Sequence, residues 1–292
     1  MQVKKAVIPA AGMGTRFLPV TKSMPKEMLP LVDTPAIHFV VKEAVDAGID
    51  DIIIITGRGK RSIENYFDES PELELFLKKK GKPEILDFIA EITNMVNVHY
   101  IRQKEPCGLP NAILQAEKHV GDEPFAVLLG DDIIKSDKPC IEQLIEVFTK
   151  VKSSVLAVQE VPLEKISRYG SIDGTKVQPN NISENILYKV QDIVEKPRPE
   201  DAPSLIASIG RYVFTPEIFD CIHQTKPGVN NELQIADSIR LLMKNQEMYA
   251  SEFHGHRYDI GDKLGYLEAV IDYALEKTDL SKDLKKFLKT RC

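Results

Sequence analysis

The stretch that decides the fold is AVIPAAGMGTRF, residues 6–17, followed by PKEMLP at residues 25–30. The apolar run at its start predicts a buried strand. The run ends at Pro9 in small residues and two glycines, which let backbone N–H groups come close to a ligand and cradle an anion. Arg16 and Lys26 add two cations. The stretch therefore predicts a phosphate-binding loop, and a triphosphate is the ligand that we expect.

A pair of glycines after a strand can also mark an ordinary turn. The spacing is not that of the dinucleotide fingerprint, which needs a third glycine, and no Gly-Lys-Ser/Thr follows to make a Walker loop. The whole string, GMGTR at residues 12–16 and then PKEMLP, resembles the signature of the sugar-nucleotide pyrophosphorylases. KEMLPLVDTP, residues 26–35, is similar to the branch formed by the bacterial-type UTP–glucose-1-phosphate uridylyltransferases.

Composition narrows the possible partners and compartment. The chain has 292 residues, 43% of them hydrophobic and 28% charged, which suits a globular α/β domain. A net charge of −6 gives no broad basic field, so we expect no nucleic acid partner. The longest apolar run, Ile52–Ile55, is too short to cross a membrane, and no apolar signal core follows the first residues. Scattered cysteines predict free thiols of a reducing cytoplasm, namely Cys107, Cys140, Cys221 and Cys292.

Strand and helix signals alternate along the first half of the chain. Residues 35–48 have apolar positions at helical spacing and 52–56 is a β-branched run, which together with the first strand predict a right-handed βαβ unit. Residues 60–95 break this rhythm and predict three short helices, inserted over one edge of the sheet. From Tyr169 onward, alternating segments predict antiparallel strands. Residues 261–292 are expected to close the chain as helices.

We expect a single α/β domain, residues 1–292. The resemblance implies a Rossmann-like three-layer nucleotide-diphospho-sugar transferase fold with a central mixed, mainly parallel sheet. It assigns residues 1–160, with the helical insertion at 60–95, to the nucleotide-binding half. Residues 161–260 would then form the sugar-binding half, ahead of the C-terminal helices.

The chemistry of phosphoryl-type transfer asks for positioning and charge neutralisation rather than a covalent nucleophile. The sequence offers no obvious nucleophilic triad, and His223, His254 and His256 show no metal-ligand pattern. Asp131 and Asp132 follow an apolar strand and a glycine, where an open α/β sheet binds its ligands, although a plain turn has the same pattern. Carboxylate oxygens at this position suit Mg²⁺.

The resemblance implies catalytic roles for five residues. Asp131 matches the family's first metal-binding aspartate, and Asp259 matches the second carboxylate, so both would bind Mg²⁺. Arg16 and Lys26 would stabilise the leaving pyrophosphate. Lys196, in Glu-Lys-Pro, would hold the sugar phosphate as a flexible point charge, although such a tripeptide is also common in solvated turns.

Further residues are expected to hold the substrates. Gln103 would read the uracil edge with its amide, and Glu195 would accept sugar hydroxyls. Gly170 would offer its backbone to the hexose, while Asp132 would line the sugar pocket. The expected nucleotide-binding residues are Ala10, Ala11, Gly12, Gly14, Thr15, Glu27, Gln103 and Gly108, and the expected sugar-binding residues are Asp132, Gly170, Glu195 and Lys196.

The resemblance implies an enzyme that makes UDP-glucose and pyrophosphate from UTP and glucose 1-phosphate, by in-line attack of the sugar phosphate on the α-phosphorus. Three alternatives stay open. A sister enzyme would use dTTP, since uracil and thymine differ by one methyl group. A glycosyltransferase would be expected to have an Asp-x-Asp metal motif, whereas this chain has two adjacent aspartates. A non-catalytic regulatory relative would have lost the reaction. Family members are often oligomeric, which implies a homo-dimer or homo-tetramer.

Overall fold

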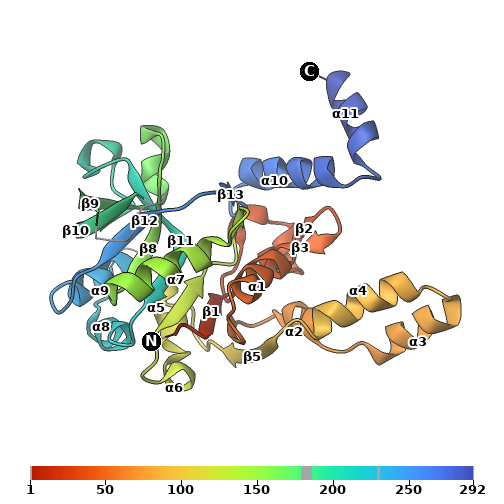
Figure 1. Cartoon of the computed structure of the whole chain (residues 1–292), viewed down its shortest axis with the longest axis horizontal. Coiled ribbons are helices and arrows are strands. Elements are labelled where there is room, and N and C mark those ends of the chain that lie inside the picture. Colours follow the sequence, from red (N-terminus) through yellow and green to blue (C-terminus); the bar gives the residue numbers. More distant parts are fainter. Residues whose placement is uncertain (1, 179–185, 229–230, 292) are drawn as a thin grey trace.

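The computed structural model describes residues 2–178, 186–228 and 231–291. A nine-stranded sheet runs through the body in the order β5-β4-β1-β6-β11-β8-β12-β10-β9 (Figure 1). Its first four strands pair in parallel, so their carboxyl ends lie along the same edge. These strands are β1 (Lys5–Pro9), β4 (Asp51–Thr56), β5 (Asn97–Arg102) and β6 (Phe125–Leu128).

Helices cover both faces of this parallel half. On β1, Ala6 and Ile8 face one hydrophobic core while Val7 faces the other, and all three are fully buried. Burial on both faces explains why the strand has a continuous apolar run rather than an alternating one. The predicted three-layer α/β architecture is therefore confirmed. One layer contains α1 (Ala36–Asp46) and α7 (Cys140–Val151); the other contains α5 (Leu109–Leu114), α6 (Glu117–Val120), α8 (Ile218–Gln224) and α9 (Ile235–Leu242).

The second half of the sheet is built differently. β11 pairs antiparallel with β6, β8 and β9, and β9 also pairs with β10, so that β11, β8, β12, β10 and β9 form a closed ring of pairings. Gly170 consequently lies opposite both Ser208 and Glu195. The antiparallel strands expected after Tyr169 are confirmed, whereas the ring was not predicted. The strands are β8 (Val155–Glu160), β9 (Gly170–Val177), β10 (Leu187–Glu195), β11 (Ile206–Phe214) and β12 (Tyr249–Glu252).

Two short ribbons flank the main sheet. β7 (Asp132–Lys135) pairs antiparallel with β13 (His256–Asp259), with Asp132 opposite Asp259. β2 (Pro30–Leu31) and β3 (Thr34–Pro35) make a small turn before α1. The first ribbon matters for the site, because it brings a segment near the end of the chain beside the turn that follows β6.

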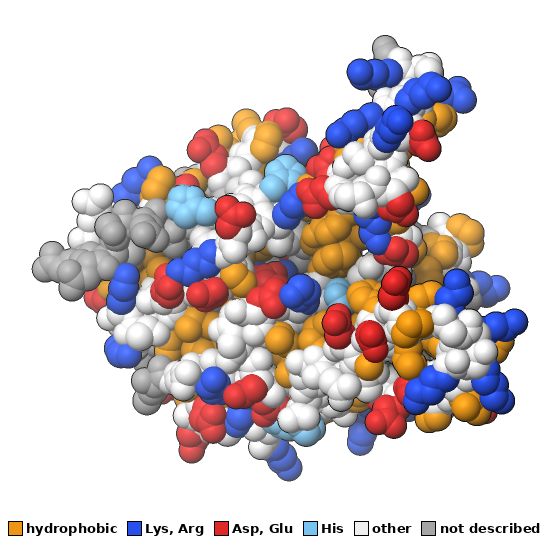
Figure 2. All heavy atoms as spheres, turned by 45° about the vertical axis from the view of Figure 1, so that its right-hand side comes forward, with side chains coloured by type: hydrophobic (Ala, Val, Ile, Leu, Met, Phe, Trp, Pro, Cys, Tyr) orange, Lys and Arg blue, Asp and Glu red, His pale blue; other side chains and the backbone are white. Residues whose placement is uncertain are grey.

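The insertion forms three helices, α2 (Arg61–Phe67), α3 (Pro71–Lys80) and α4 (Pro83–Thr93). They cover the sheet edge only in part. Helix α2 packs there, with the Tyr100 hydroxyl of β5 donating to the Glu64 carbonyl at 3.5 Å, whereas α3 and α4 form a hairpin that extends outward from the body (Figure 1). The edge strand β5 keeps exposed or half-exposed side chains along its length. Apolar side chains gather on the surface of the hairpin, as Figure 2 shows, and include the exposed Phe76 and Phe88.

The chain closes with α10 (Lys263–Glu276) and α11 (Ser281–Lys289), which also extend from the body (Figure 1). Tyr266 of α10 packs edge-on against Phe17, with ring centroids 5.6 Å apart, and its hydroxyl donates to the Pro30 carbonyl at 2.9 Å. These contacts tie α10 to the loop after β1. No helix among the described residues combines the length and apolar character needed to span a membrane.

A buried ion pair connects the layers. Arg211 of β11 is fully buried and donates to Glu43 of α1 from Nε to Oε1 at 3.0 Å and from Nη2 to Oε2 at 2.6 Å. The same guanidinium donates to the carbonyls of Leu129 and Asp132 at 3.1 and 2.7 Å. Glu43 also accepts from the backbone N–H of Ile141 at 3.1 Å, near the start of α7. This pair therefore fixes two helices, one strand and the turn after β6.

We expect Arg211→Met to lower the free energy of unfolding by about 3–5 kcal/mol, because it leaves the Glu43 carboxylate buried without a cation. Urea denaturation measures the loss. The matched control is Arg240→Met, which removes a bidentate pair with the half-exposed Asp192 at 2.7 and 2.9 Å and should cost under about 1 kcal/mol. Equal losses in the two variants would contradict the role given to Arg211.

Candidate active site

The loop after β1 presents its backbone to solvent. Gly14 has a left-handed φ of 65°, which turns the chain, and the Thr21 hydroxyl donates to its carbonyl at 2.8 Å. Within the described residues, the N–H groups of residues 11–14 have no hydrogen-bond partner. Open amides on a glycine loop make a concave anion site. The loop thus has the geometry that its sequence predicts for phosphate.

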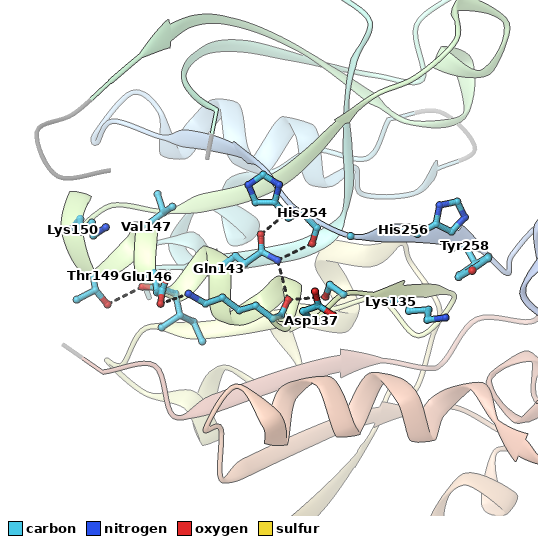
Figure 3. Close-up of a pocket in the computed structure, with 14 residues that line it drawn as sticks. Lys135, Asp137, Gln143, Glu146, Val147, Thr149, Lys150, His254, His256 and Tyr258 are labelled. Atoms are coloured by element: carbon cyan, nitrogen blue, oxygen red, sulfur yellow. Dashed lines mark hydrogen bonds and ion pairs between the residues drawn. The ribbon is translucent and has the colours of Figure 1, made fainter. Parts of the chain in front are cut away.

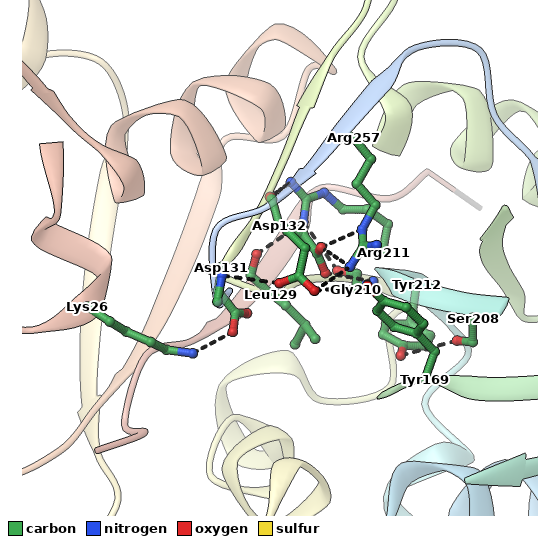
Figure 4. Close-up of polar contacts among 12 residues, drawn as sticks. Lys26, Leu129, Asp131, Asp132, Tyr169, Ser208, Gly210, Arg211, Tyr212 and Arg257 are labelled. Carbon is green, nitrogen blue, oxygen red and sulfur yellow. Dashed lines mark hydrogen bonds and ion pairs between the residues drawn. The ribbon is translucent and has the colours of Figure 1, made fainter. Parts of the chain in front are cut away.

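Lys26 lies beside the predicted metal-binding carboxylate. Its Nζ donates to Asp131 Oδ2 at 2.6 Å (Figure 4). Burial alone would lower the pKa of Lys26, but the charges of Asp131 and Glu27 raise it above the ordinary value. Burial alone would raise the pKa of Asp131, but the charge and hydrogen bond of Lys26 bring it below the ordinary value. Both groups are therefore charged at neutral pH.

Asp131 and Asp259 converge on the backbone of Gly261. A Cβ atom added at Gly261 would lie 2.9 Å from Asp131 Oδ2 and 3.2 Å from Asp259 Oδ1, so a side chain would fill the space between the carboxylates. Arg16 reaches the same point, with its Nη1 donating to the Gly261 carbonyl at 3.3 Å. Residues from the first loop, the β6 turn and the end of β13 thus meet within a few ångströms, which sequence spacing alone could not show.

A polar network positions Asp259 and its neighbours. The Tyr169 hydroxyl donates to Asp259 Oδ2 at 2.9 Å, and burial raises the pKa of Tyr169, which keeps this hydroxyl protonated. Arg257 lies over the Tyr169 ring, 4.8 Å from its centroid, and donates to Asp132 Oδ1 at 2.5 Å. Asp132 Oδ2 accepts from the Gly210 N–H at 3.1 Å (Figure 4). Both Asp132 oxygens are therefore engaged within the protein.

A cavity of about 330 Å³ joins the two halves of the site. Lys196 sits on its rim with a φ of 44°, an unusual left-handed backbone for a lysine, and its Nζ donates to Glu195 Oε1 at 2.7 Å. Its backbone N–H donates to the Tyr169 carbonyl at 2.9 Å. The predicted site residues that line this cavity are Arg16, Asp131, Asp132, Gly170, Glu195, Lys196 and Asp259.

Three residues predicted to bind the nucleotide have partners within the protein. The Gln103 amide donates to Asn111 Oδ1 at 2.6 Å. Gly108, with a φ of 95°, lies against the backbone of Leu233. Glu27 is buried and pairs with Lys60 at 2.7 Å, while its other carboxylate oxygen has no hydrogen-bond partner. Ala10, Ala11, Gly12, Gly14 and Thr15 all lie in the loop after β1.

Several residues of the site were not predicted from the sequence. Arg257 and Tyr169 hold the carboxylates, and Arg211 holds the turn that carries Asp131. Two signals could have found the arginines. A charged residue inside the apolar run 206–214 must have buried partners, and Arg257 shares a strand face with Asp259, two residues on.

A second and larger cavity, about 1080 Å³, lies elsewhere. It is an open surface hollow along α7 and residues 254–256 (Figure 3). Gln143 spans it, donating to the carbonyls of Lys138 and His254 at 2.9 Å each. None of the predicted site residues lines this hollow, so the smaller cavity, which gathers the carboxylates and cations, is the candidate active site.

The fold and the site together place carboxylates and cations around a loop with open backbone amides. The sequence pattern described as Nucleotidyl transferase matches residues 5–276. A UTP–glucose-1-phosphate uridylyltransferase from Staphylococcus epidermidis is 50% identical over 288 residues, covering 99% of this chain and 98% of that protein. The chain therefore belongs to the nucleotidyl transferase family, and it is similar along its whole length to uridylyltransferases.

Solved structures agree with this assignment. A UTP-bound UDP-glucose pyrophosphorylase (UGPase) from Acinetobacter baumannii is 40% identical with a TM-score of 0.87, covering 98% of this chain and 99% of that one. A UDP-glucose pyrophosphorylase complexed with UDP-glucose is 45% identical with a TM-score of 0.84, covering 93% and 98%. A Bacillus anthracis protein assigned as a glucose-1-phosphate thymidylyltransferase is more distant, at 27% identity and a TM-score of 0.69.

We expect Gly108→Ala to destabilise the protein strongly, because an added Cβ would lie 2.3 Å from the Leu233 carbonyl oxygen. The control is Gly121→Ala, where φ is also positive, at 65°, but no atom lies within 4 Å of the added Cβ. The control should lose about 1–3 kcal/mol from backbone strain, since Gly121 has a ψ of −141° with its positive φ, and Gly108→Ala about 1–3 kcal/mol more from the clash. Thermal and urea unfolding measure both losses, and equal losses would refute the close approach.

Proposed function

We propose that the protein is a UTP–glucose-1-phosphate uridylyltransferase, which makes UDP-glucose and pyrophosphate from UTP and glucose 1-phosphate. The observation that carries the proposal is the convergence of Asp131, Asp259 and Arg16 on Gly261, beside a loop with open amides. This arrangement can align two phosphorylated reactants without forming a bond to the protein. The near full-length similarity to uridylyltransferases supports the choice of substrates.

The nucleotide phosphates are held by the loop after β1 in this proposal. Its free N–H groups donate hydrogen bonds to phosphate oxygens, as expected of a backbone nest, and Arg16 and Lys26 neutralise the departing pyrophosphate. Lys26 exchanges its Asp131 partner for phosphate when UTP enters. Its raised pKa keeps it cationic throughout, so it acts as a fixed charge rather than as a proton donor.

Asp131 and Asp259 are the residues that would hold Mg²⁺. Oxygen ligands from carboxylates are what this ion prefers, and the two side chains already border the space beside Gly261. When bound, the ion would supply charge neutralisation on the phosphates. Tyr169 keeps Asp259 oriented by its hydrogen bond, and the lowered pKa of Asp131 keeps that carboxylate ionised.

Residues 161–260 supply the sugar side of the proposed site. Lys196 holds the phosphate of glucose 1-phosphate, Glu195 accepts hexose hydroxyls and Gly170 offers its backbone. In-line attack of the sugar phosphate oxygen on the α-phosphorus needs this phosphate placed opposite the leaving pyrophosphate. Asp132 is assigned a positioning role in place of sugar contact, because Arg257 and the Gly210 amide already engage its oxygens.

Base recognition is assigned to Gln103 and Gly108. The hydrogen bond from Gln103 to Asn111 holds the Gln103 amide in one orientation, so that its carbonyl oxygen is held in place to pair with the base. A fixed amide discriminates against bases that cannot pair with it, since the unpaired polar group costs free energy. Uracil and thymine share the same pairing edge, so an apolar contact with the thymine methyl decides between UTP and dTTP.

The proposal extends to assembly and compartment. Exposed apolar side chains on the C-terminal helices, such as Leu264, Leu267 and Phe287, offer a surface for a homo-dimer or homo-tetramer. Cys107, Cys140 and Cys221 are free thiols, which fits a cytoplasmic protein. Cys292 lies outside the described residues.

An assay of pyrophosphate release tests the proposed reaction. With glucose 1-phosphate and Mg²⁺, we expect UTP to support turnover at least about tenfold better than dTTP, which corresponds to about 1.4 kcal/mol. Removing the metal with a chelator should abolish release, and adding Mg²⁺ back should restore it. Faster release with dTTP would favour a thymidylyltransferase, and no release with any nucleotide would favour a non-catalytic relative.

The role of Lys26 is tested with Lys26→Ala. Losing a charge that stabilises the leaving group should lower kcat by about 100-fold or more while the fold is kept. Lys22→Ala, at an exposed lysine of the same loop, is the matched control and should change kcat less than about threefold. Steady-state kinetics and circular dichroism check both variants. Near-normal turnover in Lys26→Ala would remove this residue from the mechanism.

A further inference from the structure

A second cluster of ligating side chains lies on the edge of the sheet opposite the active site. It contains Asp51, the first residue of β4, with His99 of β5 and His119 of α6. One ligand atom from each residue lies within 4.8 Å of the other two. Thr56, the last residue of β4, lies at the carboxyl end of the strand, on the side of the proposed active site. It is about 16 Å from Asp51 along the strand, at roughly 3.3 Å per residue. The cluster is therefore separate from the proposed reaction.

The two imidazoles face the same carboxylate. His119 Nε2 is 3.1 Å from both oxygens of Asp51, and His99 Nε2 is 3.7 Å from Oδ1. The two rings are 4.6 Å apart between centroids and tilted by 55°, so they lie side by side rather than stacked flat. Both Nε2 atoms thus point at a common position next to Asp51.

The distances from Asp51 to the two histidines are close to those between ligand atoms of a tetrahedral metal site. Ligand atoms at about 2.0–2.1 Å from a tetrahedral ion lie about 3.4 Å from one another, between the observed 3.1 and 3.7 Å. Two imidazoles and a carboxylate suit Zn²⁺ and its first-row neighbours, whereas Mg²⁺ and Ca²⁺ prefer oxygen ligands alone. His99 is about half exposed, so the position is open to solvent and leaves room for a water ligand.

The neighbouring cation Lys5 forms its bonds away from the cluster. Lys5, whose Cα is paired with that of Asp51 across the sheet, donates to the carbonyls of His119 and Val120 at 3.2 and 3.1 Å and pairs with Glu123 at 3.2 Å. These bonds hold the carboxyl end of α6 against β1, which orients His119. Among the residues that the structure describes, the side chain of Asp51 has the two histidines as its partners.

We propose that Asp51, His99 and His119 form a surface site for a divalent transition-metal ion of the Zn²⁺ class. The inference goes beyond the proposed uridylyltransferase activity and does not depend on it. A bound ion would join β4, β5 and α6 at the amino-terminal edge of the sheet. Since it binds the folded chain and draws on three separate segments, it would raise the thermal stability of the protein.

Isothermal titration of the metal-free protein with ZnCl₂, in excess Mg²⁺ to occupy the active-site carboxylates, tests the proposal. We expect one Zn²⁺ per chain together with a rise in Tm. Replacing a residue that only orients a metal ligand already weakens binding about 10–100-fold. His99→Ala and His119→Gln should each therefore weaken Zn²⁺ binding by about 100-fold or more. His119→Gln keeps a hydrogen-bond donor toward Asp51, which protects the local fold.

Two controls make the result decisive. His223→Ala removes an exposed histidine that faces Glu117 alone, at 3.0 Å, and should leave Zn²⁺ binding unchanged. Asp131→Asn should also leave it unchanged, because that carboxylate belongs to the other edge. The absence of binding would overturn the proposal, as would Zn²⁺ binding that survives the double change at His99 and His119 or disappears in Asp131→Asn. Paramagnetic broadening of the two histidine ring signals by Co²⁺ is an independent readout in the unaltered protein.

Discussion

The buried pair of Arg211 and Glu43 is the interaction on which the rest of the structure depends. Burying two charges costs several kcal/mol for each, and the cost is offset only when nearly every donor and acceptor is satisfied. Here the guanidinium donates to the carboxylate and to the carbonyls of Leu129 and Asp132. Those carbonyls flank Asp131. The requirement to satisfy a buried cation therefore fixes the backbone that presents Asp131, the carboxylate proposed to hold Mg²⁺.

From this turn, a chain of polar contacts extends to the neighbouring segments. Asp132 holds Arg257, which lies over Tyr169, and Tyr169 in turn donates to Asp259. Asp131 meets Lys26 on the other side. Each carboxylate thus has a cation or a donor before any substrate arrives, which keeps several like charges close together without large repulsion. Such preorganisation is what stabilisation of a charged transition state requires, because the protein need not rearrange as charge develops.

Local sequence signals predicted the parallel half of the fold and the residue types of the site. The apolar run before Pro9, the glycine loop and the turn at Asp131 all depend on neighbours in the chain, so their pattern could be interpreted directly. The ring of strands and the pairing of Arg257 with Asp132 depend on contacts between segments far apart in the chain, which local spacing does not show. The resemblance to a family supplied the role of Asp259, but its meeting with Asp131 at Gly261 is visible only in three dimensions.

Strand β11 connects the proposed sugar side of the site to the turn that carries Asp131. Ser208 pairs with Gly170 on the sugar side, and Arg211, three residues later, holds the turn of the metal side. Between them Gly210 approaches so closely that a Cβ atom would lie 2.4 Å from Asp132 Oδ2. A slip of one residue would reverse the face of every side chain on the strand, and would bring a bulkier residue to the position of Gly210. The register of one strand thus sets the distance between Gly170, on the proposed sugar side, and the turn that carries Asp131.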